Sequence, residues 1–118
     1  MSLESAMFDA LQALVEGRVY PDVAPENTPR PYFTYQQVGG RAVNFVDSAL
    51  PSKKNARVQV NVWAETRLQA SALGRQAEDT LRVIPALQTT ALSALVAVYE
   101  PETQLRGTRQ DFSVWFDG

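Results

Sequence analysis

Apolar residues recur at every third or fourth position in two segments of the chain, which is the spacing of one face of a helix. In the first segment they are Leu3, Met7, Leu11, Leu14 and Val15. Ser2 can cap the first turn, and Gly17 suits the position just past the helix end. The pattern predicts an amphipathic N-terminal helix that buries one face.

The second helical segment begins after Thr66, and Gln69 follows it at the spacing of a capping box. Its apolar stripe consists of Ala70, Leu73, Ala77, Leu81 and Ile84. Pro85 ends this helix, because a proline disfavours helical conformation in the residue before it.

Strands are indicated by alternation of apolar and polar residues. In "RVQVNVWAE", residues 57–65, one face receives Val58, Val60 and Val62, and the other receives Arg57, Gln59, Asn61 and Trp63. Strands are also predicted over residues 32–38, 92–100 and 108–116, the last two joined by a turn.

Four prolines separate the first helix from the first strand: Pro21, Pro25, Pro29 and Pro31. Each lacks an amide donor and restricts the residue before it, so residues 18–31 cannot be helical. We expect an extended strap that fixes the first helix relative to the sheet, anchored to the core by Tyr20, Tyr32 and Tyr35.

This order of elements predicts an α+β fold with two helices packed on a mainly antiparallel sheet of about four strands. A chain of 118 residues with 45% hydrophobic residues can form one compact core and is short for two. We therefore expect a single domain covering residues 1–118.

The connection over residues 41–56 is long for a hairpin and carries apolar residues of its own, Phe45, Val46 and Leu50, before Lys53 and Lys54. These side chains could pack on the core of their own domain, or the segment could be an arm that packs on a neighbouring subunit. Its length and its own hydrophobic residues favour the arm.

Composition restricts an enzyme of this sequence to catalysis by carboxylates, lysine, tyrosine or hydroxyls. The chain has no cysteine and no histidine, which excludes disulfides, thiolate metal sites and thiol nucleophiles. The close acidic pairs lie in loops or, for Glu78 and Asp79, point in different directions from a helix. Gly39 and Gly40 lack the spacing of a phosphate-binding loop. We predict no enzymatic activity, no catalytic residue, no cofactor and no metal.

The formal charge is −2, and the basic residues are scattered apart from Lys53, Lys54 and Arg57. Nonspecific affinity for nucleic acid comes mainly from clustered positive charge, so we expect this chain to have little attraction for phosphate backbones. We therefore expect no autonomous DNA binding and no sequence-specific nucleic-acid partner. No apolar run approaches the roughly 18 to 20 residues that span a bilayer, and no signal-peptide pattern is present. We expect synthesis in the cytoplasm and no membrane partner.

Both tryptophans fall on the polar-patterned face of their strands. Trp63 alternates with the valines of its strand, and Trp115 falls on the same side as Arg109. Either a helix or loop of the same chain covers this face, or it is a protein interface, since interface cores favour Trp and Arg. The candidate interface residues are Phe45, Val46, Leu50, Lys53, Lys54, Arg57, Trp63, Arg109 and Trp115.

Several motifs in order along nearly the whole chain resemble the tail-completion (tail-terminator) proteins of long-tailed phages and prophages. They are "GRVYPDVAP", "PRPYFTYQQVG", "RVQVNVWAET" and "DFSVWF". None of them is catalytic. The resemblance implies a structural subunit of a homo-oligomeric ring, hexameric by similarity, at the head-proximal end of the tail tube.

By the same resemblance, the ring would end polymerisation of the tube and form the head-joining interface. Its partners would be other copies of itself, the tail-tube protein and a head-completion protein. Its location would be the tail or neck of the virion, after assembly in the host bacterial cytoplasm. The alternative is another head-tail joining subunit, because neck components overlap in size and composition.

Overall fold

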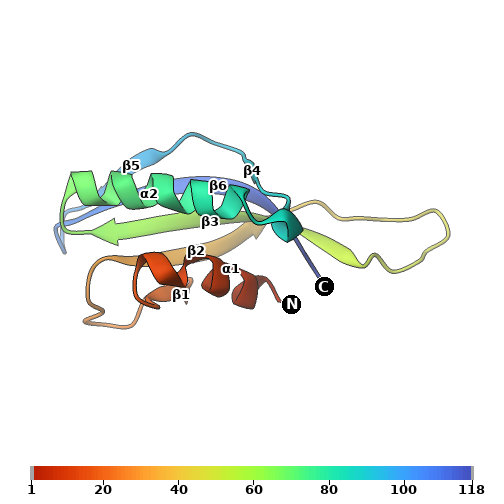
Figure 1. Ribbon diagram of the computed structural model, residues 1–118, viewed down its shortest axis with the longest axis horizontal. Coiled ribbons are helices and arrows are strands. Elements are labelled where there is room, and N and C mark those ends of the chain that lie inside the picture. Colours follow the sequence, from red (N-terminus) through yellow and green to blue (C-terminus); the bar gives the residue numbers. More distant parts are fainter. Residues whose placement is uncertain (1, 118) are drawn as a thin grey trace.

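A computed structural model describes residues 2–117 and has α+β architecture, as expected (Figure 1). Along the chain the elements are helix α1 (Leu3–Leu11), the 3-10 turn η1 (Gln12–Leu14), strands β1 (Val19–Pro21), β2 (Tyr32–Gly39) and β3 (Lys53–Ala64), helix α2 (Arg67–Arg82), the 3-10 turn η2 (Pro85–Leu87), and strands β4 (Thr90–Ala91), β5 (Val96–Glu100) and β6 (Leu105–Asp117).

The sheet has six strands rather than about four, and it is mixed, where a mainly antiparallel sheet was expected. The strand order is β1-β2-β3-β6, and both β4 and β5 pair with the free edge of β6. β1 runs parallel to β2, with Val19 opposite Phe33, and the other pairs are antiparallel. β1 and β4 have three and two residues, too few for an alternating pattern to be recognised in the sequence.

The predicted N-caps of both helices are confirmed, whereas the α-helices end a few residues earlier than predicted, at Leu11 and Arg82. The Ser2 hydroxyl accepts a hydrogen bond from the Ser5 amide at 3.0 Å, and the Thr66 hydroxyl accepts one from the Gln69 amide at 3.1 Å. Gly17 has a φ of 83°, a conformation that favours glycine at the end of a helical segment. Both helices therefore begin where side-chain oxygens replace the missing intrahelical acceptors.

The two helices lie on one face of the sheet and form one core with it (Figure 1). Met7 and Leu11 of α1 and Leu81 of α2 are fully buried, as are Phe33 and Phe112 of the sheet. The valines of β3 point into this core, as their alternation predicted.

The proline-rich strap is tied to the sheet through β1. The amide of Asp22 donates to the carbonyl of Tyr35 at 2.8 Å, and Arg18 Nε donates to the carbonyl of Pro31 at 2.9 Å. Tyr35 is buried, and the rings of Tyr20 and Tyr32 meet edge to face with centroids 6.5 Å apart. The strap is therefore anchored in part by the three tyrosines, as expected, and in part by a short strand that the sequence pattern did not indicate.

A buried polar contact joins α2 to the sheet. Gln110 of β6 lies among the core residues, and its Nε2 donates to Glu78 Oε1 at 2.6 Å and to the carbonyl of Ser93 at 2.9 Å. Arg82 Nε donates to the other carboxylate oxygen of Glu78 at 3.0 Å. The hydrogen bond from Gln110 has the largest effect on the pKa of Glu78 and lowers it. The bond from Arg82 also lowers this pKa, whereas partial burial raises it.

We expect Gln110→Ala to lower the free energy of unfolding by about 1–3 kcal/mol, because it leaves the Ser93 carbonyl and the Glu78 carboxylate without their buried donor. The pKa of Glu78 is lower in the folded protein than in the unfolded chain. Its contribution to the free energy of unfolding is therefore fully present above the unfolded pKa and is lost as pH falls through the folded pKa. The stability difference between variant and wild type should therefore narrow in that acidic range, as measured by urea unfolding at several pH values.

The matched control is Gln36→Ala, which removes an exposed amide from β2 and should change stability by less than about 0.5 kcal/mol. If Gln110→Ala lowers the free energy of unfolding at neutral pH by no more than Gln36→Ala does, the buried contact does not stabilise the fold as proposed.

Candidate interaction surface

The face of the sheet opposite the helices is here called the open face. Within residues 2–117 no helix packs on it, since both helices bury their apolar stripes in the core on the other side. The strand register brings the polar-patterned side chains of β2, β3 and β6 together on this face. Its residues include Tyr32, Thr34, Gln36, Asn55, Arg57, Gln59, Asn61, Trp63, Arg109, Asp111, Ser113 and Trp115.

Trp63 is half-buried on the open face by contacts within its own chain. Its indole Nε1 donates to Thr34 Oγ1 at 3.1 Å, and its ring lies over Gly107 on the adjacent strand. A Cβ atom on Gly107 would lie 2.6 Å from the Val62 carbonyl oxygen and 3.0 Å from the ring. Gly107 therefore makes the space that the tryptophan occupies, a cross-strand relation that the sequence pattern did not indicate.

The open face is hollowed at two places. The first, called the Trp63 hollow, has a volume of about 410 Å³ and is lined by Trp63, Val98, Glu100, Arg109 and the loop at residues 22–24, with neighbouring polar side chains. Tyr32 also lines this hollow. Burial raises the pKa of its hydroxyl, the charge of Glu100 raises it further, and the charge of Arg30 lowers it. The phenol is therefore neutral near pH 7 and can donate a hydrogen bond.

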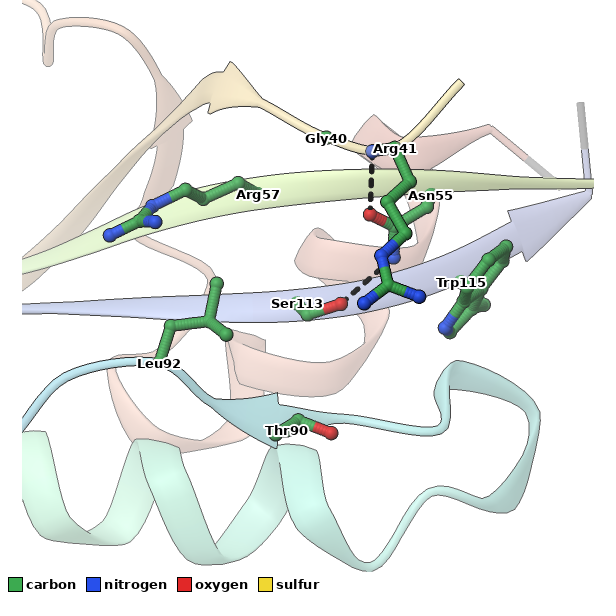
Figure 2. A pocket seen from close by; sticks show the side chains of 8 residues that line it. All are labelled: Gly40, Arg41, Asn55, Arg57, Thr90, Leu92, Ser113 and Trp115. Carbon is green, nitrogen blue, oxygen red and sulfur yellow. Dashed lines mark hydrogen bonds between the residues drawn. The ribbon is translucent and has the colours of Figure 1, made fainter. Parts of the chain in front are cut away.

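The second, called the Trp115 hollow, has a volume of about 350 Å³ (Figure 2). It is lined by Gly40, Arg41, Asn55, Arg57, Thr90, Leu92, Ser113 and Trp115. Figure 2 shows the Arg41 side chain extending over the sheet toward Ser113 and Trp115. Asn55 holds this region together, because its Oδ1 accepts from the Arg41 amide at 2.9 Å and its Nδ2 donates to Ser113 Oγ at 2.8 Å.

The two arginines proposed for the interface differ in their surroundings. Arg57 forms an ion pair with Asp111 across the β3–β6 ladder, with Nη2 2.8 Å from Oδ2. Arg109 is exposed, and none of the ion pairs among residues 2–117 includes it. Arg109 is therefore the arginine whose charge is more available to a partner.

The two lysines lie on opposite sides of the sheet. Lys53 Nζ is 3.1 Å from Asp117 Oδ1. Lys54 is in register with Phe116 and lines a different hollow, beside Ser2 and Glu4 at the start of α1. The structure does not bring Lys54 together with the tryptophans.

Residues 41–52, here called the arm, contain no helix or strand and project from one end of the long axis (Figure 1). The molecule measures 52 × 25 × 25 Å. Phe45, Val46 and Leu50 are 51%, 108% and 93% exposed, so they do not pack on the core of their own chain. Residues 53–56, included in the predicted connection, belong to β3.

The open face and the arm carry side chains suited to binding another protein. Within residues 2–117 there is no group of three His, Cys, Asp or Glu side chains that could hold a metal ion. None of the helices in that range is both long and apolar enough to cross a bilayer. What the surface offers is aromatic rings, amides and arginines, which are typical of protein interfaces.

The family model described as tail completion protein gp17 matches residues 7–117. The chain belongs to this family. Its role is therefore that of a structural protein of the phage tail, and the resemblance noted in the sequence is confirmed at that level. A comparison with curated proteins found no match.

The fold is also found in a solved structure described as the virion of a native gene transfer agent (GTA) particle. A chain of that particle superposes with a TM-score of 0.64 at 18% sequence identity, covering 99% of this chain and 96% of that one. At this identity the likeness shows a shared fold.

We expect Gly107→Ala to lower the free energy of unfolding by about 1–3 kcal/mol, because the added methyl group overlaps the Val62 carbonyl and the Trp63 ring. In a Trp115→Phe background Trp63 is the single tryptophan, and its fluorescence emission should shift as the ring is displaced. Gly17→Ala is the control: its positive φ makes it destabilising, but nothing lies within 4 Å, so emission should not change. Unchanged emission in Gly107→Ala would contradict the packing relation.

We expect the backbone amides of residues 42–50 to exchange rapidly with solvent in the isolated subunit and slowly in the assembled tail, because their apolar groups gain no burial in the free chain. Amides of β3, which is paired on both sides, serve as the internal reference and should be protected in both states. Strong protection of Phe45 and Val46 in a demonstrated monomer would contradict an arm that orders on assembly.

Proposed function

We propose that this chain caps the head-proximal end of the tail tube, ends tube polymerisation and forms the surface that joins the head, without catalytic activity. The observation that carries the proposal is the family match, which covers nearly the whole chain, including the open face and the arm. The protein would be assembled in the host cytoplasm and remain in the neck of the virion.

A cap of this kind is a closed ring, and a ring requires two different surfaces on each copy, one contacting the next copy in a head-to-tail manner. The arm and the open face are two such surfaces, and Arg41 at the base of the arm is the residue where they meet. By similarity to the family, the ring is hexameric, and its remaining partners are the tail-tube protein and a head-completion protein.

A terminator would act through its contact surfaces. A tube subunit polymerises by repeating one interface, so a cap has to offer a surface that binds the tube while withholding an equivalent surface on the other side. Such a protein acts by binding its neighbours, and aromatic and arginine side chains commonly contribute most of the binding energy at protein interfaces.

Deletion of the gene should yield tails that grow beyond their normal length and fail to join heads, because the growing end of the tube stays competent. Tail length is measured by electron microscopy of lysates with and without the gene, and expression of the wild-type chain from a plasmid should restore the normal length. Tails of normal length that merely lack heads would favour the alternative, a head-tail joining subunit.

A further inference from the structure

We propose that the arm of one copy docks in the Trp115 hollow of the next copy in the ring. The proposal rests on the proposed function, since it names the contact by which the ring closes. It assigns the exposed apolar groups of the arm to a second copy of this chain rather than to the tube or the head.

The tip of the arm contains a local turn. The Ser48 amide donates to the Phe45 carbonyl at 3.1 Å, and the Ala49 amide donates to Asp47 Oδ1 at 3.0 Å, which forms a turn. This turn presents Phe45 and Val46 to solvent together with Asp47, which is the single charged residue between 42 and 52. The partner site should therefore combine an apolar wall with a cation.

The Trp115 hollow has both features. Trp115 and Leu92 supply apolar surface, and Leu92 is 43% exposed. Arg41 supplies the cation, since no carboxylate within residues 2–117 forms an ion pair with it, whereas Arg57 is paired with Asp111. Asn55 fixes the backbone of Arg41 at the edge of the hollow.

Charge distinguishes this hollow from the other one. The Trp63 hollow contains two carboxylates, Asp22 and Glu100, against one cation, Arg109, so it would repel Asp47. The Trp115 hollow is lined by two arginines and no carboxylate, although Asp111 neutralises Arg57. The arm of the same molecule extends away from its own sheet, so the charge match is available to another copy (Figure 1).

One arm and one hollow on each copy make a contact that repeats in one direction around a ring. Arg41 is both the first residue of the arm and part of the hollow. Each subunit would therefore receive the arm of one neighbour beside the base of its own, and the contacts of successive subunits would be continuous.

The chain contains no cysteine, which permits a direct test by disulfide crosslinking. Tails are purified from phage carrying Val46→Cys with Thr90→Cys, which places one thiol on the arm tip and one at the hollow. After oxidation we expect a ladder of covalent multimers of this chain on a denaturing gel, abolished by reduction. Val46→Cys with Val23→Cys is the matched control, because Val23 lies at the Trp63 hollow, and it should stay monomeric.

A charge exchange tests the contact without requiring disulfide geometry. Asp47→Arg and Arg41→Asp should each reduce the yield of capped tails by about tenfold, because each places like charges together. The double variant should restore the yield. Single variants that cap normally, or a double variant no better than either single one, would overturn the docking.

Immunogold labelling of the same tails separates this proposal from the proposed function. Labelled, correctly capped tails that give no ladder, or a ladder from the Val23 pair instead, overturn the docking alone. A crosslink from the arm to a different virion protein also overturns it. If the label is absent from the head-proximal end of the tube, the proposed function fails as well.

Discussion

The pairing of β3 with β6 is the constraint on which the rest of the structure depends. Every residue of β3 faces a residue of β6, from Lys53 opposite Asp117 to Ala64 opposite Arg106. Because side chains alternate along a strand, this single register decides both which residues enter the core and which reach the open face. A slip of one residue would exchange the two sets, placing Arg57 under the helices and Val58 in solvent.

The two faces of this ladder are stabilised in different ways. On the helix side, close packing dominates, and the buried side-chain amide of Gln110 donates to Glu78 and to the Ser93 carbonyl. On the open side, side chains brace one another across strands, as Arg57 does with Asp111 and Trp63 with Thr34. The open face is therefore a preformed surface, which lowers the entropy that a partner has to overcome on binding.

The arm contrasts with this braced surface. The arm leaves the sheet at Arg41, whose amide donates to Asn55 Oδ1. Beyond that residue, the hydrogen bonds of the arm lie within a local turn. A tail protein that is made as a free subunit and used in an assembly can combine a stable sheet with such a segment. Under the proposed docking, the segment gains its burial from the next subunit.

Local chemistry in the sequence was enough to determine the helices, their caps and the inward-facing valines of β3, because capping and periodicity depend on neighbours a few residues apart. It also determined that both tryptophans lie on the polar-patterned side. The parallel pairing of β1, the two-residue strand β4 and the space that Gly107 leaves for Trp63 were decided by tertiary structure. So were the pairing of Arg57 with Asp111 and the exposure of Phe45. Each of these features depends on which distant segments meet and in what register. A strand of two or three residues, or a single glycine, carries no periodic pattern in the sequence from which such a feature could be predicted.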